Sequence, residues 1–411
     1  MAETAADQLE AWLAHRLPAG WADAASSQDD ERLDELQAEM DLDAFLDALG
    51  AAGWQTPMWD PEHGGLGLSP TEAREVEATM IRQQVPRGFD FVGRALVAAC
   101  IKSFGSSEQL TMLDDIARSR VRWCQLFSEP GSGSDLAGLS TRAVKDGDVW
   151  VVNGQKVWSS WAQRSDWGIL LARTDPDQAK HKGITCFLLD MTTPGIDVRP
   201  LRQMTGDDEF NEVFFNDVAI PDSMRLGPVD EGWMVSTTAL MNERGSLSGR
   251  PKVGRGIVDQ VIDEAKERGT WNDPVVRDRL MTLWCAERAN QMTALRSAAG
   301  AQAGRPPGPE ASTGKLAGSE LNQRIAAARI DLMGPAATAY DEVPERPEPN
   351  GRGELTMANL DAQFLFLYSP ASTILGGTSN IQRNIIGERV LGLPREPDTF
   401  KGAPWSEVPR N

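Results

Sequence analysis

The spacing of apolar residues changes its period twice along this 411-residue chain, and this change restricts the possible folds more than any other feature. Up to about residue 121, apolar residues recur with the spacing of one helical face. From 122 to 229, short apolar or alternating runs are separated by turn signals such as Asn153-Gly154. From Asp230 the helical spacing returns. The pattern predicts an α+β chain with an N-terminal helical domain (1–121), a small β domain (122–229) and a C-terminal helical bundle (230–411).

The individual elements can be placed within these three parts. We expect helices near 29–50, 70–84, 90–104, 107–118, 274–303, 313–334, 355–373 and 379–391. We expect strands at Trp123–Phe127, Ser140–Val144, Trp150–Val152, Gln155–Trp158, Gly168–Ala172, Thr185–Asp190, Ile196–Leu201 and Glu212–Phe215. Several short strands joined by tight turns predict a compact antiparallel sheet or a barrel-like domain.

Charge and targeting signals exclude several classes of protein. There are 41 basic and 60 acidic residues, for a net charge of −19, which argues against a nucleic-acid binder. No secretory signal and no apolar run of about 20 residues is present, so we expect a cytoplasmic protein with no membrane span and with reduced, buried thiols. Residues 1–50 hold 13 acidic and 2 basic residues, which predicts a solvated helix face or, alternatively, a docking surface for a basic partner.

Metal and histidine chemistry also find little support. The three histidines and four cysteines are scattered, with no metal-ligand spacing and no nucleophile motif around them: His15, His63, His181, Cys100, Cys124, Cys186 and Cys285. We therefore expect no metal site. If the chain is an enzyme, carboxylates or a bound organic cofactor must carry its chemistry.

Two glycine-containing segments are candidate ligand sites. Ser128-Glu-Pro-Gly-Ser-Gly-Ser-Asp135 follows a predicted strand, and its glycines allow backbone N–H groups to converge on a phosphate. An ordinary tight loop is the alternative. In Leu375-Gly-Gly-Thr-Ser-Asn-Ile-Gln382, Ser379 and Gln382 have the spacing of a capping box, so a helix start would face the Gly-Gly turn. A plain capped helix is the alternative.

Two single residues are further candidates. On a predicted helix, Ala239 and Leu240 lie one turn before Glu243 and Leu247 one turn after it, so this carboxylate is a candidate general base. A solvated or paired rim glutamate is the alternative. Trp158 stands beside two serines at a strand end, where it is either core or the wall of a flat cofactor site.

Three of these segments, in order, resemble the signatures of the FAD-dependent acyl-CoA dehydrogenase family. Ser128–Asp135 is similar to T/S-E-P-x-x-G-S-D, Asn153–Trp158 to N-G-x-K-x-W, and Gly377–Arg383 to G-T-x-x-I-Q-R. The similarity runs from Pro61 to Pro394. The resemblance implies a helical domain, a middle β domain and a helical bundle, assembled as a tetramer.

The resemblance also implies site residues. It places FAD against Phe127, Ser128, Gly133, Ser134, Trp158, Ser160, Thr378 and Asn380, and, across a subunit interface, against Arg268 and Trp271. It implies that the acyl-CoA substrate meets Ser134, Arg244 and Gly377.

Two positions depart from the common family pattern. Many members carry the catalytic glutamate directly before the G-T of the last signature, where this chain has Gly376. A smaller branch places it directly before an arginine on the first helix of the C-terminal domain, and Glu243-Arg244 resembles that placement. In Asp331-Leu-Met-Gly334-Pro335, a Gln and a Gly-Gly pair that contact a neighbour's FAD in many members are missing. This departure puts a symmetric FAD interface in doubt and suggests a mixed tetramer with a related chain.

The resemblance implies α,β-dehydrogenation of an acyl-CoA thioester to the trans-2-enoyl-CoA. Glu243 would remove the α-proton, the Gly376 N–H would polarise the thioester carbonyl, and the β-hydride would pass to flavin N5. Electrons would leave through an electron-transferring flavoprotein. A flavin monooxygenase of the same fold and a structural subunit of a mixed tetramer are the alternatives. Relatives with a base on this helix act on branched-chain, long-chain or steroid side-chain substrates.

Overall fold

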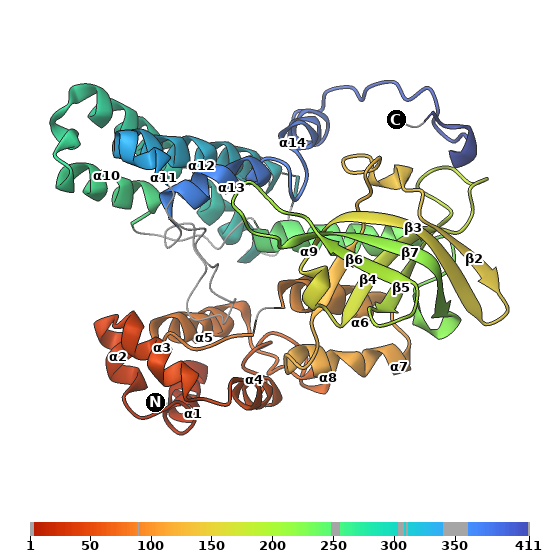
Figure 1. The fold of residues 1–411 in the computed structure, drawn as a ribbon, viewed down its shortest axis with the longest axis horizontal. Coiled ribbons are helices and arrows are strands. Elements are labelled where there is room, and N and C mark those ends of the chain that lie inside the picture. The colour runs from red at the N-terminus through yellow and green to blue at the C-terminus, as the bar shows by residue number, and fades with distance from the viewer. Residues whose placement is uncertain are drawn as a thin grey trace.

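The computed structural model describes residues 4–88, 90–247, 255–302, 308–309, 311–339 and 361–409. Its first part is helical, as predicted (Figure 1). The helices are α1 (Ala5–Ala14), α2 (Trp21–Ser27), α3 (Asp30–Ala38), α4 (Leu42–Ala51), α5 (Pro70–Arg82), α6 (Ala98–Phe104), α7 (Ser107–Leu110) and α8 (Met112–Ala117), with a π-helical turn at Val92–Val97. The predicted helix at 29–50 is divided by Asp41, whose side chain accepts from the Ala44 N–H and caps α4. Helices α1 and α2 were not predicted.

The acidic N-terminal segment buries its apolar residues and exposes its charges. Leu9, Leu33 and Leu49 are fully buried, whereas nearly all the acidic side chains on α1–α4 lie at the surface. This exposure agrees with the solvated helix face expected from the sequence, and a docking role for the same face stays a prediction.

The β domain is a single eight-stranded sheet with the order β6-β7-β3-β2-β4-β5-β8 and with β1 beside β4. The strands are β1 (Trp123–Leu126), β2 (Arg142–Asp146), β3 (Val149–Ser160), β4 (Trp167–Arg173), β5 (Ile184–Asp190), β6 (Ile196–Pro200), β7 (Phe210–Pro221) and β8 (Arg225–Leu226). The two short strands predicted at 150–158 are one strand with bulges, opposite β7. The expectation of an antiparallel sheet is wrong at two places, because β1 and β2 both run parallel to β4, β2 through the single pair Arg142 and Arg173.

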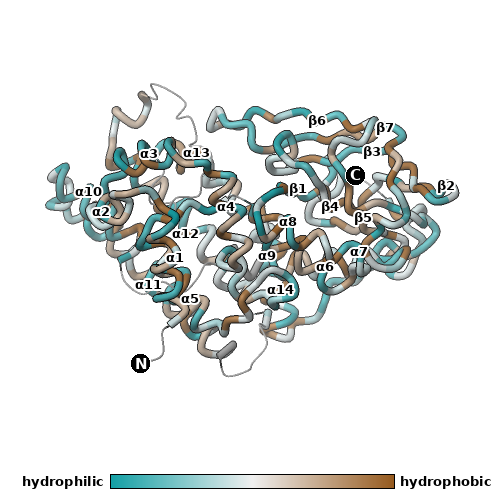
Figure 2. Tube along the Cα trace, turned by 90° about the horizontal axis from the view of Figure 1, so that it is seen from below, coloured by the Kyte–Doolittle hydropathy of each residue, from teal (hydrophilic) through white to brown (hydrophobic). Residues whose placement is uncertain are grey.

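The C-terminal part returns to helices. These are α9 (Gly232–Leu247), α10 (Ile257–Glu267), α11 (Pro274–Gln302), α12 (Ala311–Met333), α13 (Ala362–Ser372) and α14 (Ser379–Ile385), which continues as a π-helical turn to Val390. The predicted 355–373 helix begins at Ala362 in the described residues, and 355–360 lie outside them. In Figure 1 and in the orthogonal view of Figure 2, α10 lies at the opposite end of the molecule from the sheet.

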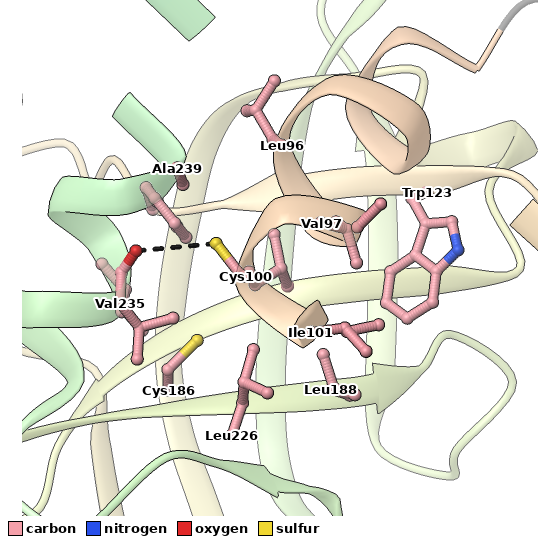
Figure 3. Packing of buried hydrophobic residues seen from close by; sticks show 14 of the residues in the cluster. Leu96, Val97, Cys100, Ile101, Trp123, Cys186, Leu188, Leu226, Val235 and Ala239 are labelled. Carbon is pink, nitrogen blue, oxygen red and sulfur yellow. Dashed lines mark hydrogen bonds between the residues drawn. The ribbon is translucent and has the colours of Figure 1, made fainter. Parts of the chain in front are cut away.

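A buried cluster fixes α9 between α6 and the sheet (Figure 3). Val235 and Ala239 of α9 pack with Ile101 and Leu188, and the Cys100 thiol donates to the Val235 carbonyl across 3.6 Å. Burial raises the pKa of Cys100 to about 12, so this thiol stays neutral and contributes to the packing of the core. Three cysteines are buried, as expected, but Cys285 is exposed, which corrects that expectation. The cluster gives α9, and therefore Glu243, a fixed position.

Candidate active site

The loop that carries the first signature is closed at its base by a buried ion pair. Lys156 Nζ of β3 lies 2.8 Å from Glu129 Oε1 and donates to the Phe127 carbonyl at 2.9 Å. The Glu129 carboxylate also accepts the backbone N–H groups of Ser140 (2.6 Å) and Thr141 (2.9 Å). Burial opposes ionisation of Glu129, but the Lys156 charge and these donors outweigh it and lower its pKa. The pair therefore joins the first two signatures into one structural unit.

Gly133 and Ser134 lie on the exposed part of this loop. Ser132 braces the turn, since its hydroxyl donates to the Asp135 carbonyl at 2.6 Å. A Cβ atom at Gly133 would have open space around it. The expected phosphate loop is thus accessible to a ligand.

Trp158 and Ser160 lie at the end of β3, beside the start of the same loop. The Val157 N–H donates to the Ser128 carbonyl at 2.9 Å, which holds the two segments together. Trp158 has a φ of 62°, which is strained for a side chain of this size, and its indole is 61% exposed. Trp158 is therefore not a core residue, and its role as the wall of a flat cofactor site stays a prediction.

A small cavity of about 30 Å³ lies behind Ser160. Asp90 and Trp161 also line it, and burial raises the pKa of Asp90 to about 6 in spite of the nearby Arg94. Asp90 caps the following helical segment by accepting the Gly93 N–H at 2.8 Å. The cavity has room for water but is too small for a substrate.

The strand end with Ser160 is connected to the C-terminal helices. The Trp161 N–H donates to the Glu209 carbonyl at 2.7 Å, and the Tyr368 hydroxyl of α13 donates to Glu209 Oε1 at 3.4 Å. Through these bonds α13 lies against the β domain beside the predicted flavin strand.

Lys315 of α12 joins the two elements that carry the predicted catalytic groups. Its ammonium donates to the Ser372 carbonyl at 2.8 Å, at the end of α13 and four residues before Gly376. Burial lowers the pKa of Lys315, and the Glu243 carboxylate of α9 acts against this by attraction. Glu243 is partly buried, one turn beyond the buried Ala239, so the carboxylate borders the core as expected. The side chains of Arg244 and Leu247 lie outside the described part of the chain.

Gly376 and Gly377 form a turn with positive φ angles of 63° and 95°. The Gln382 amide donates at 3.2 Å to both of their carbonyls, so the two oxygens are directed at α14. The helix cap differs from the expected one: Thr378 is the N-cap and its hydroxyl accepts the Ile381 N–H at 3.3 Å, whereas Gln382 braces the turn. Asn380 is exposed on the first turn.

Arg268 caps the end of α10 and Trp271 lies in the 3₁₀ turn that follows, and α10 is far from the β domain in both views (Figures 1 and 2). Within one chain they do not meet the other predicted residues. Asp331, at the end of α12, is paired with Arg279 at 2.6 Å, and Gly334 begins a 3₁₀ turn with Pro335 in its second position.

Sequence reasoning missed three contributors to the site: Lys315, Tyr368 and the Glu129–Lys156 pair. The pair stands inside the two quoted signatures, so the recurrence of a glutamate and a lysine there was an available signal. No sequence pattern signals Lys315 or Tyr368, because their partners come from other elements.

Two classes of site find no support in the described residues. No group of histidine, cysteine and acidic side chains among them is arranged to hold a metal ion. None of the helices they form is long and apolar enough to cross a membrane.

Comparison with known proteins agrees with this geometry. Residues 124–218 match the family model of the acyl-CoA dehydrogenase middle domain, and residues 230–391 match that of the C-terminal domain. The chain is 35% identical over 391 residues to the acyl-CoA dehydrogenase IpdE1 of Mycobacterium tuberculosis, covering 95% of this chain and 97% of the relative.

Two solved structures are similar over nearly the whole chain. The Tcur3481–Tcur3483 steroid acyl-CoA dehydrogenase matches with a TM-score of 0.73 and 26% identity, covering 95% of this chain and 97% of that one. The ChsE4–ChsE5 complex from Mycobacterium tuberculosis matches with a TM-score of 0.70 and 27% identity over the same shares. On these grounds, the chain belongs to the acyl-CoA dehydrogenase family.

Proposed function

We propose that Glu243 is the base that removes the α-proton of the acyl-CoA thioester and that the Gly376–Gly377 turn holds the thioester oxygen. The observation that carries this proposal is the position of Lys315, whose ammonium bonds to the end of α13 and attracts the Glu243 carboxylate. One cation thus attracts the proposed base and bonds to the end of α13, four residues before Gly376.

FAD is the cofactor, and the residues present fit it. Trp158 offers an exposed indole at a strained backbone position, and the space around Gly133 is open to a pyrophosphate. Phe127, Ser128, Ser134 and Ser160 would hold the rest of the molecule. FAD supplies the acceptor for the hydride that leaves the β-carbon. We infer that the electrons then pass to a separate electron-transferring flavoprotein.

The chain's own residues would position the substrate and move the proton. Ser134 and Gly377 would orient the thioester, and the Gly376 N–H would stabilise the negative charge that develops on its oxygen. Glu243 would accept the α-proton as a carboxylate, and the Lys315 ammonium attracts that carboxylate.

The base can be tested with Glu243→Gln. We expect it to abolish anaerobic flavin bleaching by an acyl-CoA substrate, because an amide cannot accept the α-proton. It should also abolish α-deuterium uptake in D2O by an acyl-CoA with sulfur at the β position, which mass spectrometry measures. Asn242→Ala, which loses only a bond to the Thr238 carbonyl one turn back, is the matched control. Retained bleaching in Glu243→Gln would overturn the assignment.

We further propose a bulky, polycyclic acyl group as the substrate. A glycine at 376, where many relatives carry the catalytic side chain, leaves volume beside the thioester. A structure similar over 95% of this chain is named a steroid acyl-CoA dehydrogenase. Bleaching by straight-chain acyl-CoAs but not by CoA esters of steroid side chains would contradict this choice.

A further inference from the structure

The chain beyond the last helix crosses back from the bundle and packs on the β domain, as Figure 1 shows. In this tail, residues 394–409, Trp405 is 8% exposed and its N–H donates to the Gln178 carbonyl at 2.7 Å. The next N–H, of Ser406, donates to the Pro176 carbonyl at 2.9 Å. The tail is therefore attached to the loop between β4 and β5. It lies outside both family-model matches, which end at residues 218 and 391.

The Trp405 side chain reaches the loop that carries Ser134. The indole N–H donates to the Gly138 carbonyl at 3.2 Å, and the ring covers the Arg173 guanidinium at 4.8 Å from its centroid. Arg173, at the end of β4, is 3% exposed and donates to the Ala137 carbonyl at 2.6 Å and to the Lys182 carbonyl at 2.7 Å. Arg173 and Trp405 thus bind adjacent carbonyls of the same loop and also contact each other.

The loop consequently has two anchors. Glu129 holds its base through Ser140 and Thr141, and Arg173 with Trp405 holds its far side at residues 137 and 138. Gly133 and Ser134 lie exposed between the anchors. A loop that is already ordered loses less conformational entropy when a ligand binds, so its anchors contribute to affinity without touching the ligand.

We propose that Arg173 and Trp405 are positioning residues that hold the 130–139 loop in its ligand-binding form, so that the tail sets the affinity for a pyrophosphate-bearing ligand. Two such ligands belong to the reaction, FAD and the CoA part of the substrate. The proposal rests on the proposed function, because it takes Ser128–Ser134 as the ligand loop.

The test compares Trp405→Ala with Phe400→Ala in the full-length protein. Phe400 lies in the same tail but is 44% exposed, so its loss should leave the loop unchanged. We expect Trp405→Ala to raise the Kd for FAD or for free coenzyme A about tenfold, and separate titrations distinguish the two ligands. Hydrogen exchange of the 130–141 amides in the ligand-free protein should become faster.

A second, more conservative variant keeps the test decisive if Trp405→Ala does not fold. Trp405→Phe keeps an aromatic ring over Arg173 and loses the bond to Gly138, so we expect a smaller rise in Kd. If the wild-type protein binds neither ligand, the proposed function itself fails. If the wild type binds and both Trp405 variants match Phe400→Ala in Kd and in amide exchange, the positioning role is overturned.

Discussion

At the scale of single residues, charge pairs in this chain organise the ligand sites. Lys156 is completely buried, and its only described ion pair is with Glu129. A buried ion pair stabilises the folded state little more than an apolar pair would. Removal of one partner, however, leaves the other charge buried and uncompensated, which is strongly destabilising. The glutamate and lysine of the first two signatures are therefore interdependent, and neither needs to touch a ligand to be required.

We predict that Lys156→Met lowers the free energy of unfolding by about 3–5 kcal/mol, because the Glu129 carboxylate is left buried without its cation. Urea denaturation at neutral pH measures this loss. In the wild type the folded-state pKa of Glu129 lies below its ordinary value of 4.5. The pair's contribution is thus complete above that value and is lost as the pH falls through the lower, folded-state pKa.

The double variant Lys156→Met with Glu129→Gln provides the control. It removes both charges, so we expect it to recover part of the loss. If Lys156→Met unfolds at the wild-type urea concentration, the pair has no structural role.

At the scale of elements, sequence patterns located most helices and strands, and the misses have physical reasons. Helix α5 begins at Pro70 with the capping box of Ser69 and Glu72, so it was predictable. Helix α1 has a similar cap at Thr4, but it is only ten residues long and buries only Leu9 and Leu13. Two buried residues are too few to show a helical spacing of apolar residues in the sequence, so this helix was not predicted. The parallel pairing of β1 with β4 was not predictable, because strand order in a sheet depends on contacts between distant segments.

The bulge in β3 determines the direction of the Trp158 side chain. Between Lys156 and Ser159 the strand shifts register against β7, which turns Trp158 outward at a φ of 62°. We predict that Trp158→Gly weakens FAD binding about tenfold while the ligand-free protein stays as stable or gains up to about 1 kcal/mol, since glycine relieves the strain. Flavin fluorescence titration and thermal unfolding of the apoprotein measure the two effects.

The matched variant for this position is Trp158→Phe. It retains an aromatic face and the strained backbone, so it should bind FAD nearly as well as the wild type. Equal FAD affinity in all three proteins would show that the exposed ring does not serve the cofactor.

At the scale of the whole molecule, the site is divided between distant regions. The signatures located the loop, the strand and the turn from sequence, but which of them meet was decided by contacts such as Tyr368–Glu209 and Lys315–Ser372. Arg268 and Trp271 follow α10, which lies at the opposite end of the molecule from the sheet, and their contact with a neighbouring subunit's FAD stays a prediction.

We predict that this chain assembles with a related partner chain into a mixed tetramer. The Asp331 carboxylate stands where many relatives have a glutamine, and Pro335 lacks an N–H, so the contact with a neighbour's FAD is weakened on this side. Two complexes of paired chains are similar to this chain. Purified alone, it should hold less than one FAD per chain, and co-expression with a related chain should raise that ratio. A homotetramer with full FAD content would contradict this, as native mass spectrometry would reveal.

The closed base of the ligand loop also has a consequence for engineering. Glu129 holds the end of the loop and Lys156 its beginning, so residues 127–141 depend on a lysine outside them. They depend in the same way on Arg173 and Trp405, which bind the carbonyls of residues 137 and 138, so a loop exchanged between relatives must be moved together with these three partners. A graft that omits the lysine would carry every ligand-facing residue and still fail.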